Sequence, residues 1–184
     1  MPTISTDGVI KQLLAVLAEA FDGPAQEWSY FTDRGAESGL LGTLMLLTAA
    51  DASHVWNGST IAAHANHLRF ALAASAAWLA GDRTSRDWSE SWSESVVDEK
   101  AWRRLQEEIR KAHRDLRRAI ELHGASTAES IGGALAAVAH CAYHLGAIRQ
   151  KVVAARSSAV SRAIAQRGWT RDELHERHPE KKPE

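Results

Sequence analysis

The stretch that decides the fold is residues 98–124, DEKAWRRLQEEIRKAHRDLRRAIELHG. Its apolar side chains recur at helical spacing and share one face; they are Trp102, Leu105, Ile109, Leu116 and Ile120. Arginine, lysine and glutamate cover most of the remaining surface, which is typical of a face in contact with water rather than of a phosphate site. Asp98 can cap the first turn and Gly124 ends the pattern. The stretch therefore predicts an amphipathic helix packed on a core.

Helical patterns also dominate the rest of the chain, and the alternation typical of strands is nearly absent. Further helices are expected at about residues 6–22, 38–47, 60–79 and 126–155. Capping residues support several of these boundaries: Thr48 with Asp51, Ser59 or Thr60, and Ser126 with Glu129. A loop with three aromatic residues spans 25–37, and a Ser-, Asp- and Glu-rich connection spans 82–97. The fold class is therefore all-α, a helical bundle with additional short helices and one long connection.

The bulk properties indicate one domain and exclude some partners. The chain has 184 residues and a formal net charge of −1, which argues against a nucleic-acid binder with a broad basic surface. We find no secretory signal and no uncharged apolar run of the roughly 18 residues that a membrane span requires. Cys141 is the only cysteine, so no intramolecular disulfide is possible. We expect a cytoplasmic protein without nucleic-acid or membrane partners, with its bundle at residues 1–156. Residues 157–184 are expected to form a short helix and a mobile charged tail.

The chemistry is most informative at residues 139–146, AHCAYHLG. Residues four apart in a helix differ by about 40° of rotation and about 6 Å of rise, so His140 and His144 project from one face. Two imidazoles at this spacing can share a metal ion. Cys141 lies about 100° away and is expected to be an inert core residue. His64 or His67, on the helix predicted at 60–79, could supply a third ligand; spacing alone does not choose between them.

Several histidines and tryptophans have simpler interpretations. The His140 and His144 pair, taken alone, is equally compatible with partly buried histidines that bond to neighbouring groups. His113 and His123 lie on or near the end of the charged helix, where solvated or capping roles are expected. Trp56, Trp78 and Trp102 stand at positions compatible with core burial, and a substrate-stacking role is the alternative.

Two motifs resemble those of the DinB/YfiT-like superfamily of metal-binding four-helix bundles: residues 60–68, TIAAHANHL, and residues 140–150, HCAYHLGAIRQ. In that family the ligand histidine follows its helix cap by about two turns, which matches Thr60 with His67 better than Thr60 with His64. The resemblance spans roughly residues 7–155. It implies a four-helix bundle, a zinc or nickel site formed by His67, His140 and His144, and a homodimer.

The resemblance also implies candidate activities. Some relatives join a low-molecular-weight thiol to an electrophile, others are isomerases, and the fold does not decide among these. We expect a metal-dependent enzyme acting on a small molecule, most plausibly a thiol-S-transferase; hydrolysis by metal-activated water is also open. The alternatives are a non-catalytic metal- or ligand-binding bundle, such as a stress-associated interaction module, and a structural helical dimer with buried histidines. No Glu or Asp stands out as a general base.

Overall fold

The computed structural model describes residues 5–25, 27–35 and 37–166. Its elements are α1 (Thr6–Asp22), α2 (Leu40–Met45), α3 (Ala49–Ser53), α4 (Ile61–Leu79), a 3₁₀-helix η1 (Trp88–Trp92), α5 (Glu99–His123) and α6 (Ala128–Gln166). The described residues contain no strand, only an isolated bridge between Trp56 and Ser59. The prediction of an all-α fold is confirmed.

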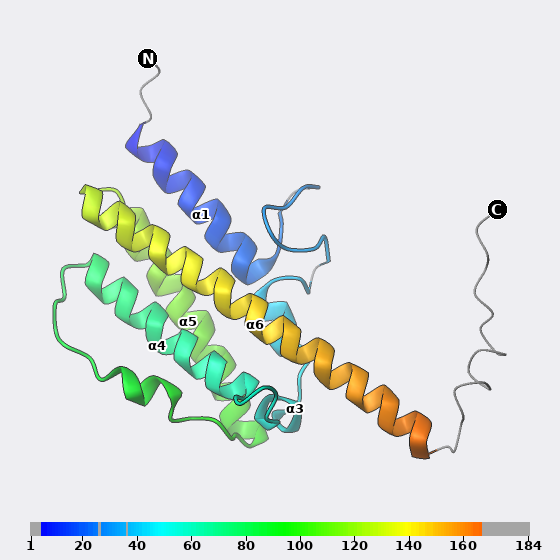
Figure 1. The fold of residues 1–184 in the computed structure, drawn as a ribbon. Coiled ribbons are helices and arrows are strands. Elements are labelled where there is room, and N and C mark those ends of the chain that lie inside the picture. Colours follow the sequence, from blue (N-terminus) through cyan, green and yellow to red (C-terminus); the bar gives the residue numbers. More distant parts are fainter. Residues whose placement is uncertain (1–4, 26, 36, 167–184) are drawn as a thin grey trace, which may run out of the picture.

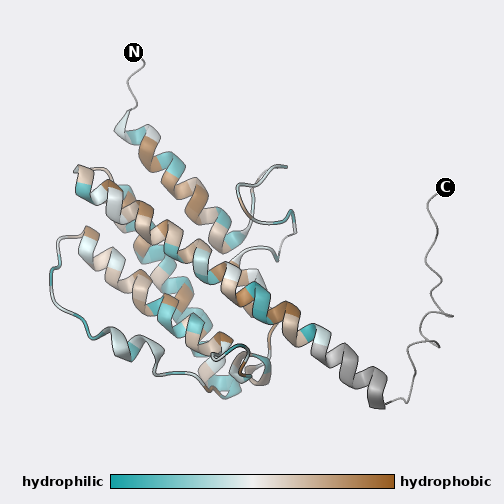
Figure 2. Ribbon diagram, in the orientation of Figure 1, coloured by the Kyte–Doolittle hydropathy of each residue, from teal (hydrophilic) through white to brown (hydrophobic). Residues whose placement is uncertain are grey.

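The four long helices enclose the core. Helix α4 packs against both α5 and α6, and α1 packs against the same two helices from the other side (Figure 1). Figure 2 shows mostly apolar or weakly polar residues along α4 and α6, whereas the connection between α4 and η1 is hydrophilic. All five apolar residues predicted for one face of α5 are buried, and Trp102 donates its indole N–H to the Leu47 carbonyl at 2.9 Å. Burial of this stripe against α1 and α4 supplies much of the apolar stabilisation.

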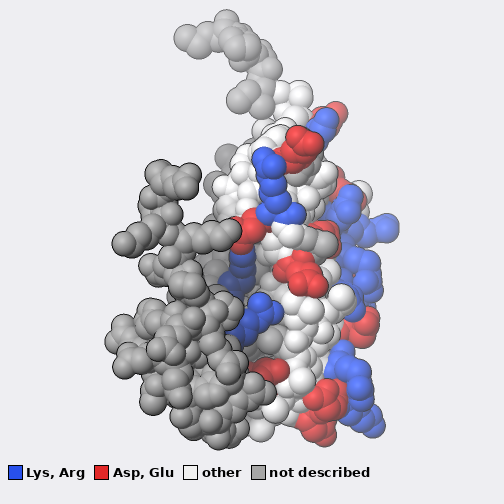
Figure 3. Space-filling view, turned by 90° about the vertical axis from the view of Figure 1, so that its right-hand side faces the viewer, with Lys and Arg blue, Asp and Glu red and all other residues white. Residues whose placement is uncertain are grey.

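The charged surface of α5 behaves as the sequence predicts. Four of its ion pairs follow helical spacing: Arg104 with Glu108, Arg110 with Glu107, Lys111 with Asp115, and Arg117 with Glu121. Two more join α5 to its surroundings, Glu108 to Arg69 and Arg104 to Glu94. Figure 3 shows Lys and Arg interleaved with Asp and Glu along one side of the molecule. Exposed pairs of this kind contribute little stability each, but they neutralise the face locally.

Most predicted caps are confirmed, with one shift of register. Thr60 and Asp98 cap their helices, and Thr48 with Asp51 forms a complete capping box. Ser5, for which no cap was predicted, caps α1. At α6 the predicted box of Ser126 and Glu129 is wrong by one residue. Thr127 Oγ1 accepts from the Ser130 amide at 3.0 Å, and Ser130 Oγ accepts from the Thr127 amide at 2.8 Å. The short Ser130 side chain reaches back as a Glu would, while Ser126 instead donates to the His123 carbonyl.

Helix α6 also ends later than predicted. It is continuous to Gln166, so the expected end near Ala155 and the separate short helix expected after residue 156 are wrong. No glycine or proline occurs from Ala147 to Gln166, and nothing else in that stretch interrupts helical hydrogen bonding. The predicted mobile tail falls on residues 167–184, outside the described part. The expectation that no apolar run reaches the length of a membrane span is wrong: the segment Ala128–Ser157 is long and apolar enough by length and composition, a test that core helices also pass.

The aromatic loop is anchored by a buried carboxylate. Glu19, only 5% exposed, accepts hydrogen bonds from the amides of Tyr30, Phe31 and Thr32 at 2.8–2.9 Å. Burial alone would raise the pKa of Glu19, but these hydrogen bonds outweigh it and hold the pKa below its ordinary value. Glu19, in the last turn of α1, thus holds a loop that contains no helix.

Candidate metal centre

Three histidines from two helices converge at one point. His67 lies on α4, His140 and His144 lie one turn apart on α6, and one ring nitrogen of each lies within 4.8 Å of the others. The Nε2 atoms of His67 and His140 are 3.1 Å apart. Two imidazole nitrogens bound to one tetrahedral zinc ion at about 2.0–2.1 Å lie roughly 3.4 Å from each other. The separation therefore suits two ligands of a single ion after a small adjustment.

A serine from the long connection determines the tautomer of His67. Ser91 Oγ donates its single proton to the Trp88 carbonyl at 2.6 Å. It must therefore accept from His67 Nδ1, which lies 2.8 Å away. With the proton on Nδ1, His67 presents a lone pair on Nε2, toward His140. This is the second hydrogen bond that metal-binding histidines ordinarily make.

His64 lies behind the cluster rather than in it. Its Nδ1 is 3.0 Å from Nδ1 of His144, and its Nε2 is 3.0 Å from Ser59 Oγ. A proton on His144 Nδ1 would be donated to His64 and leave Nε2 of His144 free as a ligand atom; His64 would then donate from Nε2 to Ser59. In the structure it is His67, and not His64, that belongs to the converging set, whereas His64 contacts the Nδ1 side of His144.

The electrostatics keep the cluster neutral. Burial lowers the pKa of His67 and of His140, with a contribution from His140 in the case of His67. The pKa of His144 falls to about 3 because burial is reinforced by the neighbouring histidines. That of His64 falls to about 4, through burial and then the charge of Lys151. All four rings are therefore neutral near pH 7, the form in which imidazole binds a metal.

The connection between α4 and α5 covers the cluster. Asn66 donates to the Ser91 carbonyl at 2.9 Å and Thr60 donates to the Ser95 carbonyl at 2.7 Å, which ties the connection to α4. Trp92 stacks on His67 with ring centroids 4.2 Å apart and planes at 20°. Trp88 lies farther out, 6.1 Å from the same ring. The sequence predicted only a long connection here; nothing in its spacing indicated that it supplies Ser91 and Trp92 to the site.

Other candidate residues fall outside the cluster. Cys141 is 2% exposed, and burial raises its pKa to about 12, so its thiol is inert as predicted. The solvated or capping role predicted for His113 is wrong, because its ring is buried and stacks on Phe21 with centroids 4.0 Å apart. Trp102 is buried in the core as predicted, whereas Trp78 is only half-buried and borders a pocket.

The donor set fits a divalent ion such as zinc. It consists of three neutral imidazoles, two of them with hydrogen bonds to their second nitrogen, and no further His, Cys, Asp or Glu joins them among the described residues. Three protein ligands leave at least one coordination position open, as in catalytic rather than structural zinc sites. No family model, curated protein or solved structure matches this chain.

Proposed function

We propose that the protein is a divalent-metal enzyme of the DinB/YfiT-like class, in which α1, α4, α5 and α6 form a four-helix bundle. Zinc or nickel is the proposed ion, held by His67, His140 and His144. The observation that carries the proposal is the convergence of three neutral imidazoles, without a fourth ligand in the described part of the chain. Such a set favours a reactive site over a closed structural one.

The proposed reaction joins a small-molecule thiol to an electrophilic carbon. A cation in this site lowers the pKa of a bound thiol and so favours the thiolate. The S–H proton passes to water, the sulfur lone pair forms the new S–C bond, and the leaving group departs with the electrons of the broken bond. His67 and His144 are held in position by Ser91 and His64. Trp92 stacks on His67 and so covers one face of that imidazole.

Metal content and thiol response test the proposal together. Protein purified without a histidine tag should contain about one equivalent of zinc or nickel per chain, and His144→Ala should abolish this binding. His54→Ala is the matched control, because His54 is exposed and its ring lies near that of Trp56, away from the three converging histidines.

Cobalt loading then separates an enzyme from a binding module. N-acetylcysteine should produce a sulfur-to-cobalt charge-transfer band. The metal-loaded protein should also accelerate its reaction with 1-chloro-2,4-dinitrobenzene above the uncatalysed rate, and the metal-free protein should not. An intact cobalt site that responds to no thiol would refute the transferase and favour the non-catalytic metal-binding protein. A chain that takes up no divalent ion would refute both.

A further inference from the structure

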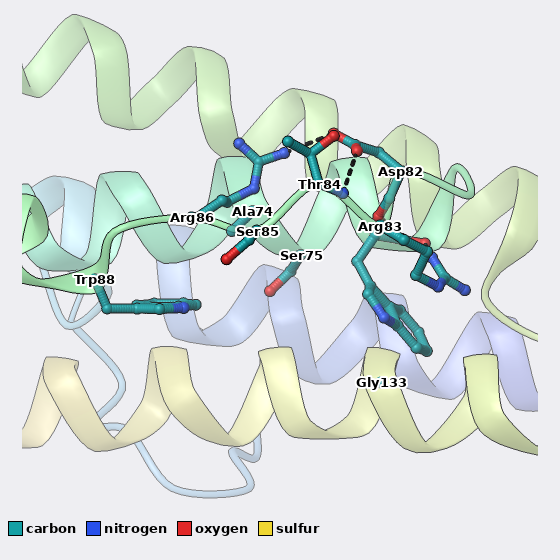
Figure 4. A pocket seen from close by; sticks show the side chains of 10 residues that line it. Ala74, Ser75, Asp82, Arg83, Thr84, Ser85, Arg86, Trp88 and Gly133 are labelled. Atoms are coloured by element: carbon teal, nitrogen blue, oxygen red, sulfur yellow. Dashed lines mark hydrogen bonds and ion pairs between the residues drawn. The ribbon is translucent and has the colours of Figure 1, made fainter.

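A pocket of about 550 Å³ lies beside the metal centre, between α4, α6 and the first part of the connection that follows α4 (Figure 4). Ala74, Ser75 and Trp78 come from α4, and Gly133 comes from α6. The connection adds Asp82, Arg83, Thr84, Ser85, Arg86 and Trp88. The volume of the pocket is in the range of small-molecule sites, roughly 300–1,000 Å³. Nothing in the proposed metal chemistry accounts for it.

Two indoles give the pocket its apolar walls, and both are held in place. A Cβ atom at Gly133 would lie 2.5 Å from Cζ3 of Trp78, so the indole occupies the space that only glycine leaves. The Arg83 guanidinium lies 4.4 Å above the Trp78 ring. Trp88 meets Phe70 edge-on at 5.2 Å and projects toward the pocket in Figure 4. Fixed aromatic faces of this kind suit a planar, apolar ligand group.

The polar groups favour an anion. The lining holds two guanidinium groups and one carboxylate, that of Asp82, which pairs with Arg86 at 2.8 Å. Arg83 instead donates one N–H to the Trp78 carbonyl at 2.6 Å. The rim therefore carries one net positive charge. The hydroxyls of Ser75 and Ser85 point toward the interior in Figure 4, and neither has a hydrogen-bond partner within the described part of the chain. Two guanidinium groups and two unpaired hydroxyls can together bind a carboxylate or a phosphate.

The pocket borders the metal centre. Ala74 and Ser75 follow His67 by seven and eight residues on α4, which is about 10–12 Å along the helix. Trp88 contributes to the pocket and lies 6.1 Å from the His67 ring. Ser75 also lines a small cavity with His140. A ligand in the pocket is therefore one short linker away from the three histidines.

We propose that this pocket binds the distal part of the substrate, a planar apolar group that carries a carboxylate or phosphate about 10 Å from the atom bound by the metal. This inference rests on the proposed function for its link to the metal, but the pocket itself can be tested without metal. The substrate class is thus an elongated organic anion with an aromatic section.

The test uses 2-naphthoate, with 2-naphthamide as the neutral probe, titrated against metal-free protein by calorimetry. Trp88→Ala and Gly133→Ala should each weaken naphthoate binding by about tenfold or more, because one removes a wall and the other displaces Trp78. Gly132→Ala is the matched control, since a Cβ there meets nothing within 4 Å. Arg86→Gln should abolish the preference for naphthoate over naphthamide. Circular dichroism establishes that each variant is folded.

A second titration tests the link to the metal. Cobalt-loaded protein should bind the mercaptoacetyl amide of 6-amino-2-naphthoate at least about tenfold more tightly than mercaptoacetamide, through effective concentration. Absence of naphthoate binding, or equal binding by the Gly132→Ala and Gly133→Ala variants, would refute the proposal that this pocket is a ligand-binding site. If naphthoate binds but the mercaptoacetyl amide binds no more tightly than mercaptoacetamide, the pocket does not bind part of the substrate. If the protein binds naphthoate but its cobalt shows no charge-transfer band with thiols, the ligand-binding pocket is supported and the proposed function is refuted.

Discussion

The sharpest prediction concerns Ser91, which contacts the metal centre only through His67. Ser91→Ala removes the acceptor of the His67 Nδ1–H and leaves that group unpaired in a side chain only 8% exposed. In the metal-free variant, the His67 proton can move to Nε2 or the ring can turn, and either change avoids the unpaired Nδ1–H. The metal-bound variant cannot, because Nε2 must keep its lone pair for the ion. The penalty therefore falls on metal binding.

Its size follows from the cost of an unpaired buried donor, about 1–3 kcal/mol. Since about 1.4 kcal/mol corresponds to a factor of ten, zinc affinity should fall by roughly 5- to 150-fold. Loss of an outer hydrogen bond at other metal sites costs about 10–100-fold, in agreement with this range. The connection itself should stay in place, because Asn66 bonds to the Ser91 carbonyl, which the substitution retains.

Competition against a chelating dye measures the zinc dissociation constant of each variant. Ser93→Ala is the control: this hydroxyl lies in the same segment and bonds to the Glu90 carbonyl at 2.7 Å. The reasoning is refuted if the Ser91→Ala and Ser93→Ala proteins bind zinc with the same affinity while both remain helical.

Three further predictions address stability. Zinc at a hundredfold excess over its dissociation constant should raise the free energy of unfolding by about 2.7 kcal/mol. Chelation should lower the melting temperature but leave most helicity, because a large cluster of buried apolar side chains holds the helices together without the ion; loss of helical circular dichroism on chelation would contradict this. Burial is the main cause that lowers the pKa of His113 below its ordinary value of 6.5, so the unfolded state binds the proton more readily and the metal-free protein should lose stability as the pH falls below 6.5. His113→Gln should flatten that dependence by up to about 1.4 kcal/mol per pH unit, measured by urea unfolding from pH 7.5 to 5; an unchanged slope would exclude His113 as a contributor. Glu19→Gln cannot accept from all three loop amides and should cost about 2–3 kcal/mol, whereas Glu27→Gln, at an exposed site, should cost almost nothing.

The sequence alone determined the helices and most of their boundaries. The stripe on α5 and the caps at Thr48, Thr60 and Asp98 are local patterns, and local backbone chemistry is sufficient to read them. The pairing of His140 with His144 is equally local, because a helix sets their separation. Local reading failed where two caps competed one residue apart at Thr127, and where α6 continued without a stop signal.

Only the tertiary structure decided which histidine of α4 joins the pair. His64 and His67 lie less than one turn apart, and the rotation of α4 against α6 turns one toward the cluster and the other toward the back of His144. The roles of Ser91, Trp92 and the Trp78–Trp88 pocket have no local signature either. They come from a connection that folds back onto α4 and a Gly133 that admits an indole from another helix. Contacts between residues far apart in sequence depend on the rotation of each helix about its axis and on the position at which a loop packs back on the bundle. Helical periodicity in the sequence determines neither of these.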